Sequence, residues 1–68
     1  MSSNVATLVG ELVNDEATGR IGVLTALDDE WTDPAAPRHQ RRVQRVAFIR
    51  PVGGGREWTT HPELVRQA

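Results

Sequence analysis

The fold is decided by one stretch of the sequence, Arg50 to Trp58, which reads Arg-Pro-Val-Gly-Gly-Gly-Arg-Glu-Trp. Proline cannot donate a hydrogen bond to a central β-ladder, so Arg50-Pro51 ends the apolar run that precedes it. Three successive glycines can then turn the chain, because glycine adopts backbone conformations that other residues avoid. Since a strand-like segment resumes at Arg56, the stretch predicts a strand, a hairpin turn and a second strand.

The sequence upstream of this hairpin predicts two further strands with their own turn. Apolar residues alternate along residues 8–13 and 20–27, and Gly19 supplies the positive φ that the turn between them needs. Gly22, inside the second of these segments, marks a bulge, a sharp bend of the sheet or the close approach of a second backbone, and tight barrels require such points. The predicted strands therefore cover residues 8–13, 20–27, 43–50 and 56–60.

The end of the chain predicts one helical turn followed by a short strand. Thr60 fits a helix cap with Glu63 three residues later, and Val65 and Arg66 can close the sheet. Together these elements describe an all-β fold, a small antiparallel Src-homology-3-like barrel of four to five strands with one short helical turn near the C-terminus. An open meander of three or four strands that becomes stable as a dimer is the alternative.

The domain organisation predicted from the sequence is simple. Residues 1–7 are expected to form a disordered tail, and residues 8–67 a single domain. Within it, residues 28–42 hold two prolines and only one large apolar residue, Trp31, so they predict a long loop. Loops of this length in a small domain tend to be functional or disordered.

Composition and charge exclude several classes of protein. The 68 residues contain no cysteine, which excludes disulfides and thiolate metal sites. The net charge is −1, yet residues 1–33 carry −6 and residues 34–68 carry +5. The arginines can form a basic binding face, or the two segments can pair with each other. We favour pairing, because antiparallel neighbours prefer opposite charges. No apolar run is long enough for a signal peptide or a membrane span, so a cytoplasmic location without membrane contact is expected.

Two segments carry a resemblance to known proteins. Gly10 to Val23 and Arg50 to Trp58 resemble a group of short uncharacterised actinobacterial proteins. In that group the second and third strands are closely joined, so the loop at 28–42 departs from its pattern. The first half is also similar to a KOW-type motif, in which a strand, the Gly19-Arg20 turn and a glycine-containing strand belong to a small barrel. The resemblance implies a fold and brings no established activity.

Catalytic and metal chemistry find little support in the sequence. Both serines lie in the predicted tail, and His39 and His61 have no companion nearby in the chain. The glycines at 53–55 lead into a strand, whereas phosphate-binding loops lead into a helix N-terminus. We therefore expect no enzyme activity, no metal and no cofactor.

A binding role is the remaining prediction. Trp31 lies among acidic residues, where it either folds back over the barrel or contacts a partner, because tryptophan is enriched at interface hot spots. We expect a non-catalytic protein-binding or adaptor module whose partner is another protein or a second copy of the chain. The alternative is a KOW-like nucleic-acid-binding module with an arginine face. The candidate partner-binding residues are Trp31, Arg41, Arg42, Arg45, Arg50 and Arg56.

Overall fold

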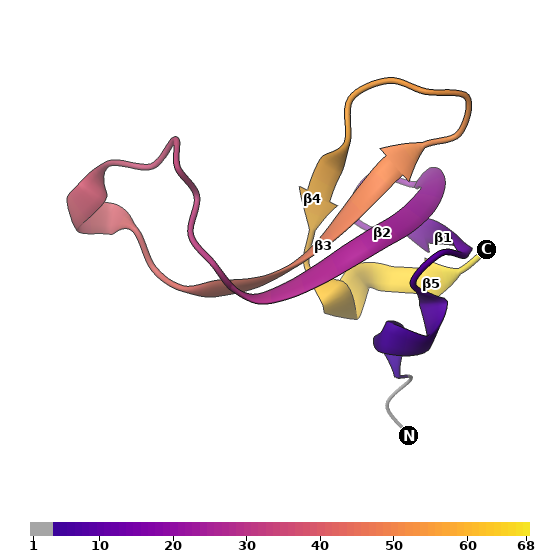
Figure 1. Ribbon diagram of the computed structural model, residues 1–68, viewed down its shortest axis with the longest axis horizontal. Coiled ribbons are helices and arrows are strands. Elements are labelled where there is room, and N and C mark those ends of the chain that lie inside the picture. Colours follow the sequence, from indigo (N-terminus) through magenta and orange to yellow (C-terminus); the bar gives the residue numbers. More distant parts are fainter. Residues whose placement is uncertain (1–3) are drawn as a thin grey trace.

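A computed structural model describes residues 4–68 of the chain as a single antiparallel β-sheet with short 3₁₀ turns (Figure 1). The part of the predicted disordered tail at residues 1–3 lies outside the described residues. The elements follow one another as η1 Val5–Leu8, β1 Leu12–Asp15, β2 Arg20–Trp31, η2 Arg38–Gln40, β3 Gln44–Pro51, β4 Trp58–Thr60, η3 Pro62–Leu64 and β5 Val65–Gln67. The prediction of an all-β fold is confirmed.

The five strands lie in the order β4-β3-β2-β1-β5, and every neighbouring pair is antiparallel. The predicted hairpin is present, because β3 ends at Pro51 and β4 pairs with β3 after a turn in which Gly53, Gly54 and Gly55 all have positive φ. The last strand, β5, returns to pair with β1. The chain therefore joins its two ends within one sheet.

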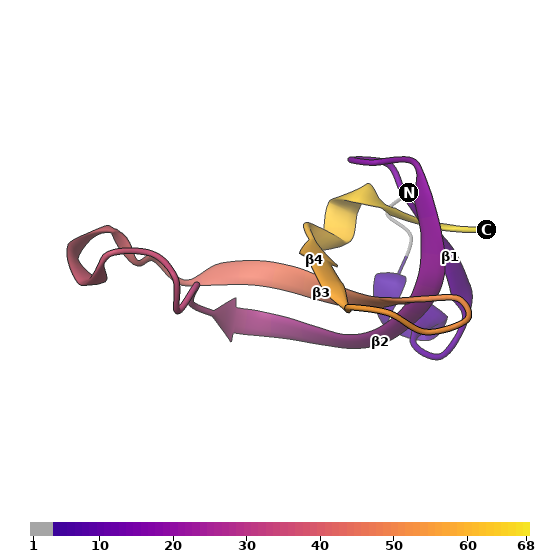
Figure 2. The ribbon, with the colours of Figure 1, turned by 90° about the horizontal axis from the view of Figure 1, so that it is seen from above.

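One face of this sheet, called here the inner face, carries the hydrophobic core. The core cluster combines side chains from four strands, which are Val13, Leu24, Ala47, Ile49 and Val65. Each is at most 1% exposed. Because cross-strand partners point to the same side of a sheet, the register also assigns their neighbours to the opposite, outer face. A core built from β1, β2, β3 and β5 requires the sheet to curve around it, as Figure 2 shows.

Gly22 lies where the curved sheet leaves no room for a side chain. A Cβ atom at this position would lie 2.5 Å from the carbonyl oxygen of Arg50 and 2.7 Å from Cγ2 of Ile49. Both distances are shorter than real Cβ contacts, and the first involves backbone that cannot swing away. The predicted close approach of a second backbone at Gly22 is confirmed.

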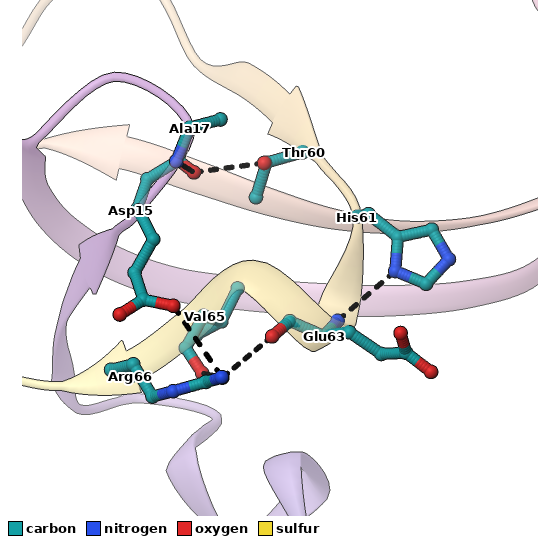
Figure 3. A network of polar contacts seen from close by, with 8 residues as sticks. Asp15, Ala17, Thr60, His61, Glu63, Val65 and Arg66 are labelled. Atoms are coloured by element: carbon teal, nitrogen blue, oxygen red, sulfur yellow. Dashed lines mark hydrogen bonds and ion pairs between the residues drawn. The ribbon is translucent and has the colours of Figure 1, made fainter.

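Asp15 joins two strands that are not neighbours in the sheet. Its carboxylate, at the end of β1, accepts hydrogen bonds from Trp58 Nε1 and from Thr60 Oγ1 on β4, both at 2.9 Å. The Thr60 contact is drawn in Figure 3. The same carboxylate accepts from the backbone N–H of Ala17 at 2.9 Å and from the hydroxyl of Thr18 at 3.4 Å. This side chain therefore holds β1 against β4 across the inner face.

The Asp15 carboxylate is 1% exposed, and its ionisation depends on these donors. Burial raises the pKa of Asp15, but the hydrogen bonds from Trp58, Ala17, Thr60 and Thr18 together lower it below the usual 3.8. Arg20 lies over the ring of Trp58 at 3.8 Å from the ring centroid. This cation–π contact covers the tryptophan that donates to the buried carboxylate.

The predicted ends of several elements were wrong. The expected first strand at 8–13 is divided between η1 and a strand that begins only at Leu12, because Gly10 takes a φ of +91° that breaks the extended chain. Val5, which falls in the predicted tail, and Leu8, which falls in the predicted first strand, both pack against the core. The second strand continues past Leu27 to Trp31, and the segment without strand structure is correspondingly shorter than 28–42.

The predicted helical turn is present, but a different residue caps it. His61 Nδ1 accepts the backbone N–H of Glu63 at 3.1 Å, while Thr60 is engaged with Asp15 (Figure 3). Arg66 then donates to the carbonyl oxygen of Glu63 at 2.6 Å and to that of Val65 at 3.0 Å. These contacts fix η3 at the start of β5, the predicted closing strand.

Replacing Gly22 by alanine is expected to destabilise the fold by about 1–3 kcal/mol, because the added methyl group overlaps backbone on β3. Urea denaturation measures this loss. Ala35→Val is the matched control, since Ala35 is an exposed residue of the loop that follows the same strand. That variant is expected to stay within about 0.5 kcal/mol of the wild type. Equal stability of the two variants would contradict the close approach at Gly22.

Asp15→Asn is expected to lower the free energy of unfolding by about 2–4 kcal/mol at neutral pH, because an amide nitrogen cannot accept the hydrogen bonds that the carboxylate accepts. The folded pKa of Asp15 lies below the unfolded one. Its contribution is therefore complete above the unfolded value near 3.8 and is lost as the pH falls through the folded pKa. Denaturation curves across this acidic range should show a steeper loss for the wild type than for the variant. Parallel curves would contradict the assignment.

Candidate partner-binding surface

The strands β2 and β3 continue together beyond the rest of the sheet. β1 pairs with β2 only up to Val23 of β2. β4 pairs with β3 only along Ala47 to Ile49 of β3. The pairs from Asp28↔Val46 to Trp31↔Gln44 therefore form a two-stranded ribbon. We call residues 28–46 the arm. Figures 1 and 2 show the arm projecting away from the remaining strands, with the connecting loop at its tip.

The loop at the tip is held by its own polar contacts. Asp33 Oδ1 accepts the backbone N–H of Ala35 at 2.9 Å, and the carbonyl oxygen of Asp33 accepts that of Ala36 at 3.2 Å. Arg41 then donates from Nε to the carbonyl oxygen of Ala36 at 3.0 Å and from Nη2 to that of Pro34 at 2.9 Å. One predicted binding residue, Arg41, is therefore used to order the loop.

Charges on the arm balance each other. Residues 28–45 contain four acids and four arginines. Arg45 Nε lies 3.2 Å from Asp29 Oδ1 across the ribbon, and Arg66 Nη2 lies 3.4 Å from Glu16 Oε1 at the other end of the molecule. Both ion pairs found in residues 4–68 join an acid of the first half of the chain to an arginine of the second half. Within the described residues, two of the seven arginines of the second half are paired in this way.

The remaining candidate arginines do not gather on one face. Arg45 follows the inner-face alternation of β3, whereas Arg50 is paired with Val23 and lies on the outer face. Arg56 is exposed in the turn before β4, and Arg42 is exposed near the base of the loop on the arm. The structure therefore places Trp31, Arg41, Arg42 and Arg45 on the arm and leaves Arg50 and Arg56 on the body of the sheet.

Trp31 lies at the end of β2 and not over the core. It is half-buried and paired with Gln44, which places it on the outer face of the arm. Val46 belongs to the same face and is 5% exposed, although it is not part of the core cluster. Phe48 also points to the outer face because its neighbours Ala47 and Ile49 point inward.

Apolar residues continue along the outer face toward the other end of β2. Ile21 is 54% exposed and the neighbouring Leu12 on β1 is 50% exposed, with Val23 half-buried between them. The outer face of β2 thus carries a line of apolar side chains from the body to the arm, interrupted by one acid. We call this set the outer row; its members are Ile21, Val23, Ala26, Asp28 and Trp31.

Sequence reasoning missed the outer row because of a β-bulge. Strict alternation places Thr25 and Leu27 on the same face as Ile21 and Val23, but the register shifts between Leu24 and Ala26. The extra residue returns Leu27 to the inner face, where it packs against the core. A second register shift, between Asp28 and Trp31, places Trp31 on the same outer face as Asp28. No residue type in these positions marks a bulge.

The arrangement offers little to acid–base or metal chemistry. His61 is committed to capping η3, and His39 is exposed in η2. The oxygens of the buried Asp15 carboxylate are occupied by hydrogen-bond donors. Among residues 4–68, histidine and acidic side chains form no cluster of three that suits a metal ion. The same described part of the chain has no helix that is long and apolar enough to cross a membrane.

Arg41→Ala is expected to speed hydrogen exchange of the Ala36 amide by about fivefold to tenfold, because two hydrogen bonds that hold the loop are lost. The melting temperature should not change, since the arm lies outside the core. Arg42→Ala is the matched control. Arg42 is the exposed neighbour of Arg41 and makes no such hydrogen bond within the described residues. Equal exchange rates in the two variants would contradict a structural role for Arg41.

Comparison of the chain with protein-family models, with curated proteins and with solved structures finds no match. The similarity to short actinobacterial proteins and to the KOW-type motif therefore stays a prediction. The arm and the outer row are the two surface features that bear on function.

Proposed function

We propose that this chain is a non-catalytic protein-binding module with a Src-homology-3-like barrel fold. The strand order, with β5 returning to β1 after a 3₁₀ turn, supports the barrel. The Asp15 hydrogen bonds to β4 support it further, because they join strands that lie at separate places in the sheet. The body of the sheet serves in this proposal as a rigid base for the arm.

The observation that carries the proposal is the arm with its half-buried Trp31. The arm leaves the sheet as a ribbon, so residues on its faces are accessible to a large partner (Figure 2). Tryptophan supplies a large contact area at low cost in conformational entropy, and it is over-represented among residues that dominate binding energy. Phe48, a half-buried neighbour on the same face, extends this surface.

Charge argues against nucleic acid as the partner. A protein that binds phosphates needs a concentration of positive charge, and its affinity falls steeply with salt. Here the arm is neutral, Arg45 is paired with Asp29, and Arg41 is bound to backbone carbonyl groups. A KOW-like role with an arginine face is therefore the weaker candidate.

Trp31→Ala is expected to lower the capture of a partner protein by about tenfold or more, while the melting temperature stays that of the wild type. The experiment compares proteins retained from cell extract by immobilised wild type and variant, identified by mass spectrometry. Val43→Ala is the matched control, because Val43 is a 66% exposed apolar residue of the arm outside its strands. A large loss of stability in Trp31→Ala would instead make this side chain structural.

Fluorescence anisotropy with a single-stranded oligonucleotide at two salt concentrations separates the two functions. We expect no salt-sensitive binding. Binding that weakens steeply with salt, and that Arg42→Ala or Arg56→Ala reduces, would replace the protein-binding proposal with the nucleic-acid alternative.

A further inference from the structure

The outer row has an internal symmetry that single residues do not reveal. Ala26 stands at its centre, with Ile21 five residues before it and Trp31 five residues after it. One register irregularity lies on each side of Ala26, between Leu24 and Ala26 and between Asp28 and Trp31. These shifts are the reason that residues an odd number of positions apart share the outer face. Each half of the row extends about 17 Å from Ala26.

This symmetry makes the row complementary to a reversed copy of itself. If two outer faces pack together with their β2 strands antiparallel and a twofold axis at Ala26, Ile21 of one copy meets Trp31 of the other. The exposed Ile21 side chain of each copy then covers the half-buried Trp31 ring of the other copy, so the contact occurs at two equivalent places. Packed sheets approach to about 10 Å, and the small side chain of Ala26 permits this approach at the axis.

The charges on this face select the same arrangement. Asp28 lies on the row between Ala26 and Trp31, and Arg50 lies beside Val23 on the opposite side of the centre. Reversal therefore places Arg50 of one copy near Asp28 of the other, twice. Neither residue belongs to an ion pair within residues 4–68. A face with opposite charges at equivalent places on either side of a centre fits its own copy better than an unrelated protein.

We propose that a second copy of this chain covers the outer row, forming an isologous dimer in which the two sheets pack face to face about Ala26. In such an interface the same patch serves on both subunits. The proposal rests on the proposed protein-binding function and names its partner. Phe48, the cross-strand partner of Ala26, lies next to the axis and adds aromatic area to the contact.

Ala26→Arg tests the packing. Ala26 is exposed in the single chain, so a longer side chain there should leave the melting temperature of the monomer unchanged while it separates the two sheets. In sedimentation equilibrium the wild type should be a dimer and Ala26→Arg a monomer. Leu64→Arg is the control, since Leu64 is a partly exposed apolar residue of η3, outside the sheet. This variant should dimerise like the wild type.

Charge reversal tests the orientation. Asp28→Arg and Arg50→Asp each bring like charges together at both equivalent places and should weaken the dimer by on the order of tenfold or more. The double variant Asp28→Arg/Arg50→Asp restores opposite charges and should recover the wild-type dissociation constant. Recovery is specific to the reversed arrangement, because a partner of another sequence would not carry the compensating change.

Several results would overturn the dimer. A wild type that sediments as a monomer at every concentration excludes it, and so does an Ala26→Arg variant that dimerises fully. Single charge reversals without effect exclude the orientation and with it the proposal. If the wild type is monomeric but still captures a protein in a Trp31-dependent manner, the binding function stands and only the second copy is wrong. If capture is absent as well, both proposals fail.

Discussion

The structure depends on a buried carboxylate that holds two distant strands together. Asp15 ends β1 and accepts hydrogen bonds from Trp58 and Thr60 on β4, which lies at the far edge of the sheet order. A buried charge without a cation is tolerated only when hydrogen-bond donors replace water, and four of them do so here. These contacts span the inner face, whose core of few apolar side chains alone would hold a domain of this size weakly.

Much of the fold could be predicted because turn chemistry is local. Gly53 to Gly55 adopt the positive φ values that their hairpin predicts, and Gly22 lies against a second backbone as expected. The long-range contacts could not be predicted in the same way. Asp15 belonged to a predicted turn, and nothing in the surrounding sequence shows that a tryptophan far along the chain donates to it.

The candidate site was only partly predictable for a related reason. The arginines and Trp31 are conspicuous in the sequence, so they were identified, but their faces depend on register. One extra residue at Thr25 exchanges the two sides of β2, turning Leu27 inward and Ala26 outward. The apolar line that runs from the body of the sheet to the arm therefore becomes visible only when the cross-strand pairs are known.

The exposed edges of the arm have a consequence for how the protein behaves at high concentration. A two-stranded ribbon presents backbone N–H and C=O groups that further strands can use, which is the route to fibrous aggregates. On this ribbon, Asp28, Asp29 and Glu30 on one strand and Arg45 on the other interrupt any run of apolar residues. These charges act as gatekeepers: they keep the edges soluble while the face beside them stays free for specific contacts.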